Sequence, residues 1–309
     1  MSVILPAFNR LEYLRAAVES VLAQTHTDWE LIIADDESGD ATKTFLDNLD
    51  DSRITRLRLR HCGIPAAVRN KAIQHARSPY LAFLDSDDVW MPRKLERQLD
   101  VMRSRRDRRW SYTGSREIDE HGDPLPGSGS ERWSPCEGAI LEPMLRFDAH
   151  IATPSVVAER SLVNEVGGFD EEQHYGEDFD LWVRLALRSE VSVVPEPLVC
   201  IRNQHADRYS RDRVAAYHSW LRLYGKMGEM VPDGPLRSLC RRRRGATSLI
   251  LAGLYVDRRD TLGMFRTVLA ASAYAWPYPD WWWGACRAIV RPAIPRRLRS
   301  MYRRMNNSP

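Results

Sequence analysis

The amino-acid sequence predicts an α/β fold, with a mostly parallel sheet flanked by helices, followed by a mainly helical basic tail. In the first third of the chain, short apolar runs alternate with segments of helical periodicity, which is typical of βαβ units. Hydrophobic residues make up 43% and charged residues 28% of the 309 residues, enough for a buried core. Residues 231–309 carry 15 Arg, no Lys and four acids, whereas the rest of the chain is acidic overall. We therefore expect one large domain at residues 1–215 and a separate region at 216–309.

The elements of the large domain follow from periodicity and turn signals. Leu11, Leu14 and Val18 share one helical face, and Pro65 suits the first turn of another helix. Residues 80–84 form a continuous apolar run, as expected of a central parallel strand. Strands are predicted at residues 2–5, 30–34, 54–59, 80–84 and 191–194, helices at 11–24, 41–49, 65–75 and 177–188, and a Gly-, Pro- and Ser-rich loop at 120–138.

The cysteines and the N-terminal residues bear on the cellular compartment. The five cysteines lie far apart without a CxxC pair, which argues against a disulfide framework and a zinc knuckle and favours a reducing compartment. The chain opens on a short apolar run followed by Pro6, with no basic n-region or cleavage site of a signal peptide. We expect a cytoplasmic protein.

Two acidic clusters follow predicted strands. Asp35-Asp36 comes after the second strand, and Asp85-Ser86-Asp87-Asp88 comes after the fourth. Ligands of open α/β sheets bind at the carboxyl ends of the strands, so both clusters should face one crevice. Along an extended chain Asp85 and Asp87 share a face while Ser86 points away, and such carboxylates suit Mg²⁺ or Mn²⁺. Capping of the following helix is the alternative, but it accounts for one acid of three.

Five segments of the chain carry polar or glycine-rich motifs next to the predicted strands and helices. They are Pro6-Ala7-Phe8-Asn9-Arg10, Asp35-Asp36-Glu37-Ser38, Arg69-Asn70, Asp85-Ser86-Asp87-Asp88, and Gly167-Gly168-Phe169-Asp170 followed by Glu177-Asp178-Phe179-Asp180-Leu181-Trp182. In this order they resemble the family 2 glycosyltransferases, and the resemblance covers roughly residues 1 to 210. Each segment alone is weak evidence, whereas five in the family's order are specific. The resemblance implies a Rossmann-like GT-A fold and an inverting sugar transfer.

The resemblance also implies roles for individual residues. The residues that would bind the nucleotide-sugar are Pro6, Ala7, Phe8, Arg10, Asp35, Asp36, Arg69, Asp85 and Ser86. Asp87 would be the leading ligand of Mn²⁺ or Mg²⁺. His205, in a segment that resembles the loop closing the site in many members, would complete the metal shell or contact the diphosphate, and plain polar surface is the alternative. Glu177 and Trp182 would lie on the acceptor side, and Asp178 would be the general base.

A carboxylate at residue 178 also has a chemical reason. An acceptor hydroxyl must lose its proton as it attacks the anomeric carbon opposite the departing diphosphate. The alternative is that Glu177-Asp178 only complements the positive start of a helix. A carboxylate beside the base favours UDP or dTDP as the donor nucleotide, although Glu37 and Lys71 stand where the family has smaller residues. The acceptor would be a glycan or a lipid-linked hydroxyl in cell-surface glycan synthesis.

The tail combines tryptophans with arginines. Trp276, Trp281, Trp282 and Trp283 lie near Arg287 and further arginines, a composition that suits a membrane interface. No apolar run reaches the roughly 20 residues that a membrane-spanning helix needs. We expect peripheral contact with the inner face of the plasma membrane and no nucleic-acid partner. A helical cap packed on the large domain is the alternative.

Two other functions stay open from the sequence. A nucleotidyltransferase also uses a sheet, a nucleotide and Mg²⁺, but it should carry a Gly-rich phosphate loop, and residues 6–10 contain no Gly. The second alternative function is that of a catalytically degenerate, membrane-associated scaffold. Such a scaffold would not need Asp36, Asp87 and Asp178, so their presence argues against it.

Overall fold

The computed structural model describes residues 1–125, 135–203 and 212–290, and the chain divides into two compact units. The first unit spans residues 1–208 and the second spans residues 209–309. Each unit contains a hydrophobic core of its own.

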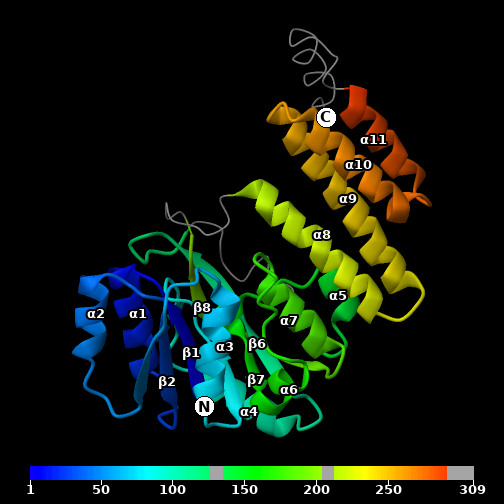
Figure 1. Ribbon diagram of the computed structural model, residues 1–309. Coiled ribbons are helices and arrows are strands. Elements are labelled where there is room, and N and C mark those ends of the chain that lie inside the picture. The colour runs from blue at the N-terminus through cyan, green and yellow to red at the C-terminus, as the bar shows by residue number, and fades with distance from the viewer. Residues whose placement is uncertain (126–134, 204–211, 291–309) are drawn as a thin grey trace. The chain divides into compact units, whose positions relative to one another are not determined.

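The first unit is built on one mixed sheet (Figure 1). Its described strands are β1 (Ser2–Ala7), β2 (Glu30–Asp35), β3 (Ile54–Arg58), β4 (Tyr80–Phe83), β5 (Val89–Trp90), β6 (Trp110–Ile118), β7 (Val157–Glu159) and β8 (Val191–Arg202). Among the described residues these eight strands have the order β3-β2-β1-β4-β7-β6-β8-β5. Pairing is parallel within β3-β2-β1-β4 and between β6 and β8, and antiparallel at β7 and β5. The predicted α/β class with its mostly parallel, helix-flanked sheet is confirmed.

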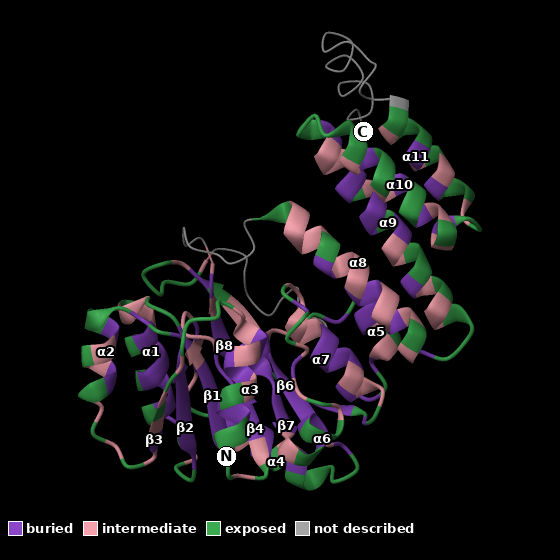
Figure 2. Ribbon diagram, in the orientation of Figure 1, coloured by how far each residue is buried: buried purple, intermediate pink, exposed green. Residues whose placement is uncertain are grey.

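Helices cover both faces of this sheet. They are α1 (Leu11–Leu22), α2 (Asp40–Asp47), α3 (Pro65–His75), α4 (Lys94–Ser104), α5 (Leu141–Arg146), α6 (Arg160–Glu165) and α7 (Glu177–Ala186). Val3 and Leu5 of β1 share a core cluster with side chains of α1, α2 and α4. Because side chains alternate along a strand, Phe83 of β4 can face the other way, where it contacts Phe169 and Trp182. Figure 2 shows the central strands as almost wholly buried.

The last strand is longer than its sequence pattern predicts. The apolar run of residues 191–194 ends at Pro195, and a second proline follows at Pro197, so the pattern predicts a short strand. In the structure β8 continues to Arg202, and its register against β6 shifts around Gly114. Irregular pairing of this kind accommodates prolines that cannot donate to a regular ladder.

The second unit is helical throughout its described part, as predicted for the tail. Its helices are α8 (Arg213–Met230), α9 (Pro235–Asp257), α10 (Thr261–Ala275) and α11 (Pro279–Val290). Trp281 is buried in the core of this unit, and its indole donates a hydrogen bond to the Gly245 carbonyl at 3.1 Å. In the described part of the chain, every helix is too short or too polar to span a membrane.

Lys94 lies in the core of the first unit with no exposed surface. Its ammonium donates to Gln98 Oε1 at 2.7 Å and lies 4.0 Å from the centre of the Trp90 ring. Burial lowers the pKa of Lys94 well below its usual value of 10.5. The folded protein therefore binds this proton less tightly than the unfolded chain does, and stability should rise with pH up to about 10.5.

We expect the substitution Lys94→Met to remove this pH dependence. Relative to the variant, the free energy of unfolding of the wild type should rise by about 1 kcal/mol or more between pH 7 and pH 10. Urea denaturation of both proteins across this range measures the difference, and all other titrating groups cancel in the comparison. Parallel pH profiles for the two proteins would contradict a lowered pKa of Lys94 in the folded protein.

Candidate active site

The loops after β1 and β2 are tied together at the carboxyl end of the sheet. The backbone amide of Asn9 donates to Ser38 Oγ at 2.7 Å, and the backbone amide of Gly39 donates to the side-chain Oδ1 of Asn9 at 2.9 Å. Asn9 and Arg10 both adopt positive φ angles, 55° and 57°. This reversal ends the extended backbone of β1 and begins α1 at Leu11, so that Arg10 lies at the sheet edge where ligands of such folds bind.

Asp36 holds a neighbouring loop in place. Its two carboxylate oxygens accept hydrogen bonds from the backbone amides of Cys62 and Gly63, both at 2.9 Å. His61 lies 2.9 Å from the same carboxylate and stacks on Phe8 with 4.5 Å between the ring centres. Asp35 and Asp36 are 2% and 4% exposed, whereas Phe8 is 45% exposed. The accessible surface at this position is therefore the Phe8–His61 pair, with Asp36 beneath it.

The acidic segment after β4 is a turn. The strand ends at Phe83, and the Asp88 amide donates to the Asp85 carbonyl at 3.1 Å, which closes residues 85–88 into a turn with Ser86 at its tip. The expectation of alternating side chains at these positions is wrong, because it assumed extended backbone. Asp87 faces the β1 loop, where its carboxylate pairs with Arg10 at 2.7 Å.

Asp88 is the buried member of the acidic turn. Its carboxylate accepts a hydrogen bond from the Arg202 backbone amide at 2.8 Å, and the side chain of Arg202 donates to the Asp87 carbonyl at 3.1 Å. Burial raises the pKa of Asp88 well above its ordinary value, and the charges of Asp87 and Asp85 raise it further. Asp88 thus connects the turn to the end of β8, and Asp85 and Asp87 remain the accessible carboxylates.

Arg69 joins the acidic turn to the start of α7. Its side chain is 7% exposed, and its guanidinium pairs with Asp85 at 2.6 Å and with Glu177 at 2.8 Å. Burial raises the pKa of Glu177 to about 7, although Arg69 favours the charged form and Asp178 opposes it. Residues that are distant in the sequence therefore meet here.

Asp178 follows Glu177 in the first turn of α7. Its carboxylate accepts hydrogen bonds from Thr153 Oγ1 at 2.9 Å and from the Phe179 amide at 2.7 Å. The side chain is neither exposed nor fully buried. Thr153 was not predicted, because it lies in a short 3₁₀ turn without a motif of its own.

Of the other predicted residues, Trp182 lies in the core and His205 is not among the described residues. Trp182 has no exposed surface and packs between Phe83, Trp110 and Phe169, so its side chain belongs to the core and does not line an acceptor surface. Pro6 and Ala7 form the end of β1, next to the Arg10 loop.

The acidic turn offers hard oxygen donors of the kind that Mg²⁺ and Mn²⁺ prefer. Asp85 and Asp87 are 26% and 19% exposed, and each is balanced by one arginine. Within residues 1–125, 135–203 and 212–290, no group of three His, Cys, Asp or Glu side chains is arranged to hold an ion. A cation that arrives with a diphosphate needs only one or two carboxylates, because phosphate oxygens and water complete its shell. The donor set therefore fits a nucleotide-bound cation.

Comparison with known proteins agrees with this geometry. The family model described as glycosyl transferase family 2 matches residues 2–165, which is more than half of the chain. This chain belongs to glycosyl transferase family 2. The match includes the β1 and β2 loops, Arg69, the acidic turn and Thr153, and it ends before Glu177 and Asp178.

Individual relatives extend the comparison. This family 2 chain is 42% identical over 127 residues to the putative teichuronic acid biosynthesis glycosyltransferase TuaG of Bacillus subtilis, across 40% of this chain and 50% of TuaG. It is 30% identical over 200 residues to the UDP-Glc:alpha-D-GlcNAc-diphosphoundecaprenol beta-1,3-glucosyltransferase WfgD of Escherichia coli, across 65% of this chain and 75% of WfgD. The match thus spans about half of the length of TuaG. The predicted family of cell-surface polysaccharide type is confirmed.

The fold of this family 2 chain also resembles a solved structure. The crystal structure of S. aureus TarS 1-349 in complex with UDP-GlcNAc superimposes with a TM-score of 0.66 at 15% sequence identity. The superposition covers 94% of this chain and 88% of that one. At this level of identity the likeness supports the GT-A fold alone.

Proposed function

We propose that this protein is an inverting glycosyltransferase that moves a sugar from a UDP- or dTDP-sugar to an acceptor hydroxyl in cell-surface polysaccharide synthesis. The observation that carries the proposal is the convergence of Arg10–Asp87 and Asp85–Arg69–Glu177 at one edge of the sheet, with Asp178 beside them. Family membership supports the reaction class. WfgD is named for a UDP-Glc donor, and the similar TarS structure holds UDP-GlcNAc. Both favour uridine as the nucleoside of the donor.

The proposed reaction uses Asp178 as the base. The acceptor oxygen forms a bond to the anomeric carbon, its proton passes to the Asp178 carboxylate, and the bond to the diphosphate breaks with its electron pair on the leaving oxygen. Thr153 would orient the carboxylate through its 2.9 Å hydrogen bond. Attack opposite the leaving group inverts the anomeric configuration.

We propose Asp87, with Asp85, as the protein ligands of Mn²⁺ or Mg²⁺. The bound cation would offset the charge that grows on the departing diphosphate. Arg10 and Arg69 are the neighbouring cations and would bind phosphate oxygens at the same edge. In this proposal the Phe8–His61 pair borders the site of the pyrimidine base.

The acceptor is proposed to be a glycan or lipid-linked hydroxyl, and the second unit to contact the inner surface of the plasma membrane. Five large apolar side chains of the described second unit are more than half exposed. Leu262, Phe265 and Leu269 lie on α10, Trp276 directly follows α10, and Trp283 lies on α11. Arginines lie among them, and aromatic side chains with arginines suit an anionic lipid interface. The relative WfgD is named for a lipid-linked acceptor, alpha-D-GlcNAc-diphosphoundecaprenol, which supports an acceptor of this class.

Nucleotide binding tests the donor site. With Mn²⁺ present, isothermal calorimetry should show binding of UDP or dTDP to the purified protein, and Asp87→Ala should weaken it by about tenfold or more, since a metal ligand is lost. Omission of Mn²⁺ should weaken wild-type binding in the same way. Asp107→Asn, at an acid that is 66% exposed in the same unit, is the control and should leave binding unchanged.

Other outcomes would distinguish the rival functions. Binding of GDP alone would exclude the proposed donor class. Binding of UDP without transfer from any UDP-sugar to a hydroxyl would favour the scaffold. Formation of a nucleotide sugar from a nucleoside triphosphate and a sugar phosphate would favour the nucleotidyltransferase.

A further inference from the structure

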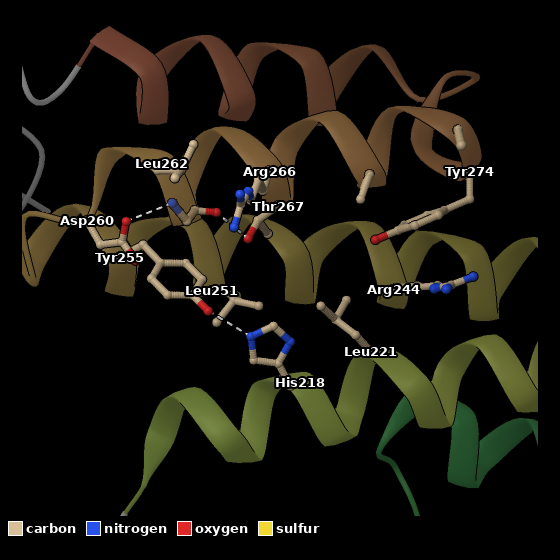
Figure 3. Close-up of a pocket in the computed structure, with 13 residues that line it drawn as sticks. His218, Leu221, Arg244, Leu251, Tyr255, Asp260, Leu262, Arg266, Thr267 and Tyr274 are labelled. Carbon is tan, nitrogen blue, oxygen red and sulfur yellow. Dashed lines mark hydrogen bonds between the residues drawn. The ribbon is translucent and has the colours of Figure 1, made fainter.

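The second unit contains a groove of about 750 Å³ whose lining includes none of the residues assigned to the transfer reaction. Helix α9 forms its floor, and α8 and α10 form its walls (Figure 3). Much of the lining is apolar, from Leu221, Leu251, Leu262, Ala270 and Ala273. This volume is typical of pockets that bind small molecules.

Arg244 lies at one end of the groove without a balancing carboxylate. Its guanidinium lies 4.2 Å from the centre of the Tyr274 ring and packs against α8, where a Cβ atom on Gly225 would come within 3.1 Å of it. In the described part of the chain, Arg244 has no ion pair, and its Nε is buried without a hydrogen-bond partner. A half-buried cation that is fixed in this way can bind an anion with little loss of side-chain entropy.

A second hollow of about 420 Å³ continues the groove past Arg244 and Tyr274. It adds Arg237 and Arg241 to the lining, together with one carboxylate, Glu229. Arg237 is engaged by Asp233, which leaves Arg241 and Arg244 as the cations that face this end. The combined groove is therefore apolar over much of its length and positive at one end.

The other end of the groove is electrically balanced. Arg266 and Asp260 both line it, and Asp260 caps α10 by accepting a hydrogen bond from the Gly263 amide at 2.8 Å. His218 and Tyr255 are hydrogen-bonded to each other at 2.8 Å across the floor. The positive charge in excess is thus at the Arg241–Arg244 end.

We propose that this groove binds one amphiphile with a long apolar chain and a phosphate-type head. The chain would lie along α10 from Leu262 toward Tyr274, a distance of about 18 Å at the rise of an α-helix. The head would bind at Arg241 and Arg244, since guanidinium groups match phosphate oxygens in geometry and charge. The inference depends on the second unit alone, so it can fail while the proposed transfer reaction holds, and the reverse.

Direct binding to the full chain tests the proposal, with farnesyl diphosphate as the probe. EDTA is included so that the proposed nucleotide site does not take up the diphosphate. We expect calorimetry to show saturable binding at one site, about tenfold or more tighter than that of inorganic diphosphate or of farnesol. Equal affinity for inorganic diphosphate would reduce the groove to an anion site and overturn the proposal, and equal affinity for farnesol would overturn the role of the arginines.

Variants locate the binding. Arg244→Gln should weaken farnesyl diphosphate binding by about tenfold, and Arg241→Gln, at an exposed residue, by at least about threefold. Ala270→Phe should fill the apolar half and weaken binding without unfolding, because Ala270 is exposed. Arg242→Gln is the matched control, since Arg242 lies on the same helix outside both hollows. Loss of binding in the control, or binding to phosphatidylglycerol vesicles without binding of the soluble probe, would overturn the groove as a site.

Discussion

Substitution of Asp178 by Asn should reduce kcat by about 10²- to 10⁴-fold with a UDP-sugar donor, while the affinity for UDP stays within about twofold. Asn keeps the size of the side chain and can still accept a hydrogen bond from Thr153, which lies 2.9 Å away in the wild type. It cannot take a proton from the acceptor hydroxyl. The measurement is the rate of UDP release with an accepted glycan, together with calorimetry of UDP binding.

Glu177 is the competing candidate for the same proton, because burial raises its pKa to about 7. Glu177→Gln therefore distinguishes the two carboxylates. If Asp178 is the base, this second variant should keep much of its activity, and Asp100→Asn, an exposed acid on α4, should keep all of it. A larger loss in Glu177→Gln than in Asp178→Asn would move the role of base to Glu177.

Much of the first unit could be predicted because its strands and helices are marked by local patterns. The predicted helix at residues 65–75 has the bounds of α3, since Pro65 determines its start and the apolar spacing continues to its end. The predicted strand at 30–34 lacks only Asp35. The fold was less predictable after residue 104, where β6, β7 and β8 pair across long sequence separations that periodicity cannot reveal.

The candidate site likewise contains features that the sequence predicts and features that only the folded chain shows. The carboxyl ends of parallel strands meet at one edge, so the meeting of the Arg10 loop with Asp87 follows from the order of the strands. The turn at residues 85–88 could not be foreseen, because its backbone departs from the strand that precedes it. Thr153 and His61 were missed for another reason. Each is a single polar residue in a short connection, and only the folded chain brings them to Asp178 and Asp36.

The groove of the second unit was beyond any pattern in the sequence. The run Arg241 to Arg244 is visible as a basic cluster, which by itself predicts only a solvated helix face. The structure separates these four arginines by their surroundings. Arg242 lies over Tyr278, whereas Arg244 turns into the groove and stacks on Tyr274.

Replacement of Arg69 by Met should destabilise the first unit by about 3 to 5 kcal/mol near pH 8. Arg69 is 6% exposed and holds Asp85 and Glu177, and Met would leave both carboxylates without their shared cation. Arg69 lowers the pKa of Glu177, so its loss should raise that pKa above the wild-type value of about 7. A carboxyl whose pKa is raised by folding costs stability as the pH rises through that pKa, so the deficit should be smaller at about pH 5.5.

Urea denaturation of both proteins at about pH 5.5 and about pH 8, with hydrogen exchange of the β4 amides to report on the first unit, measures this deficit. The double variant Arg69→Met/Glu177→Gln should recover part of the lost stability at the higher pH, because Gln cannot ionise and the buried charge of Glu177 no longer forms. The exposed residue Arg60 is not paired with these acids, and Arg60→Met provides the control for loss of a surface arginine. A deficit that is equal at both pH values and unrelieved in the double variant would mean that Arg69 contributes packing against Phe169, which lies 5.3 Å from its guanidinium, and not compensation of buried charge.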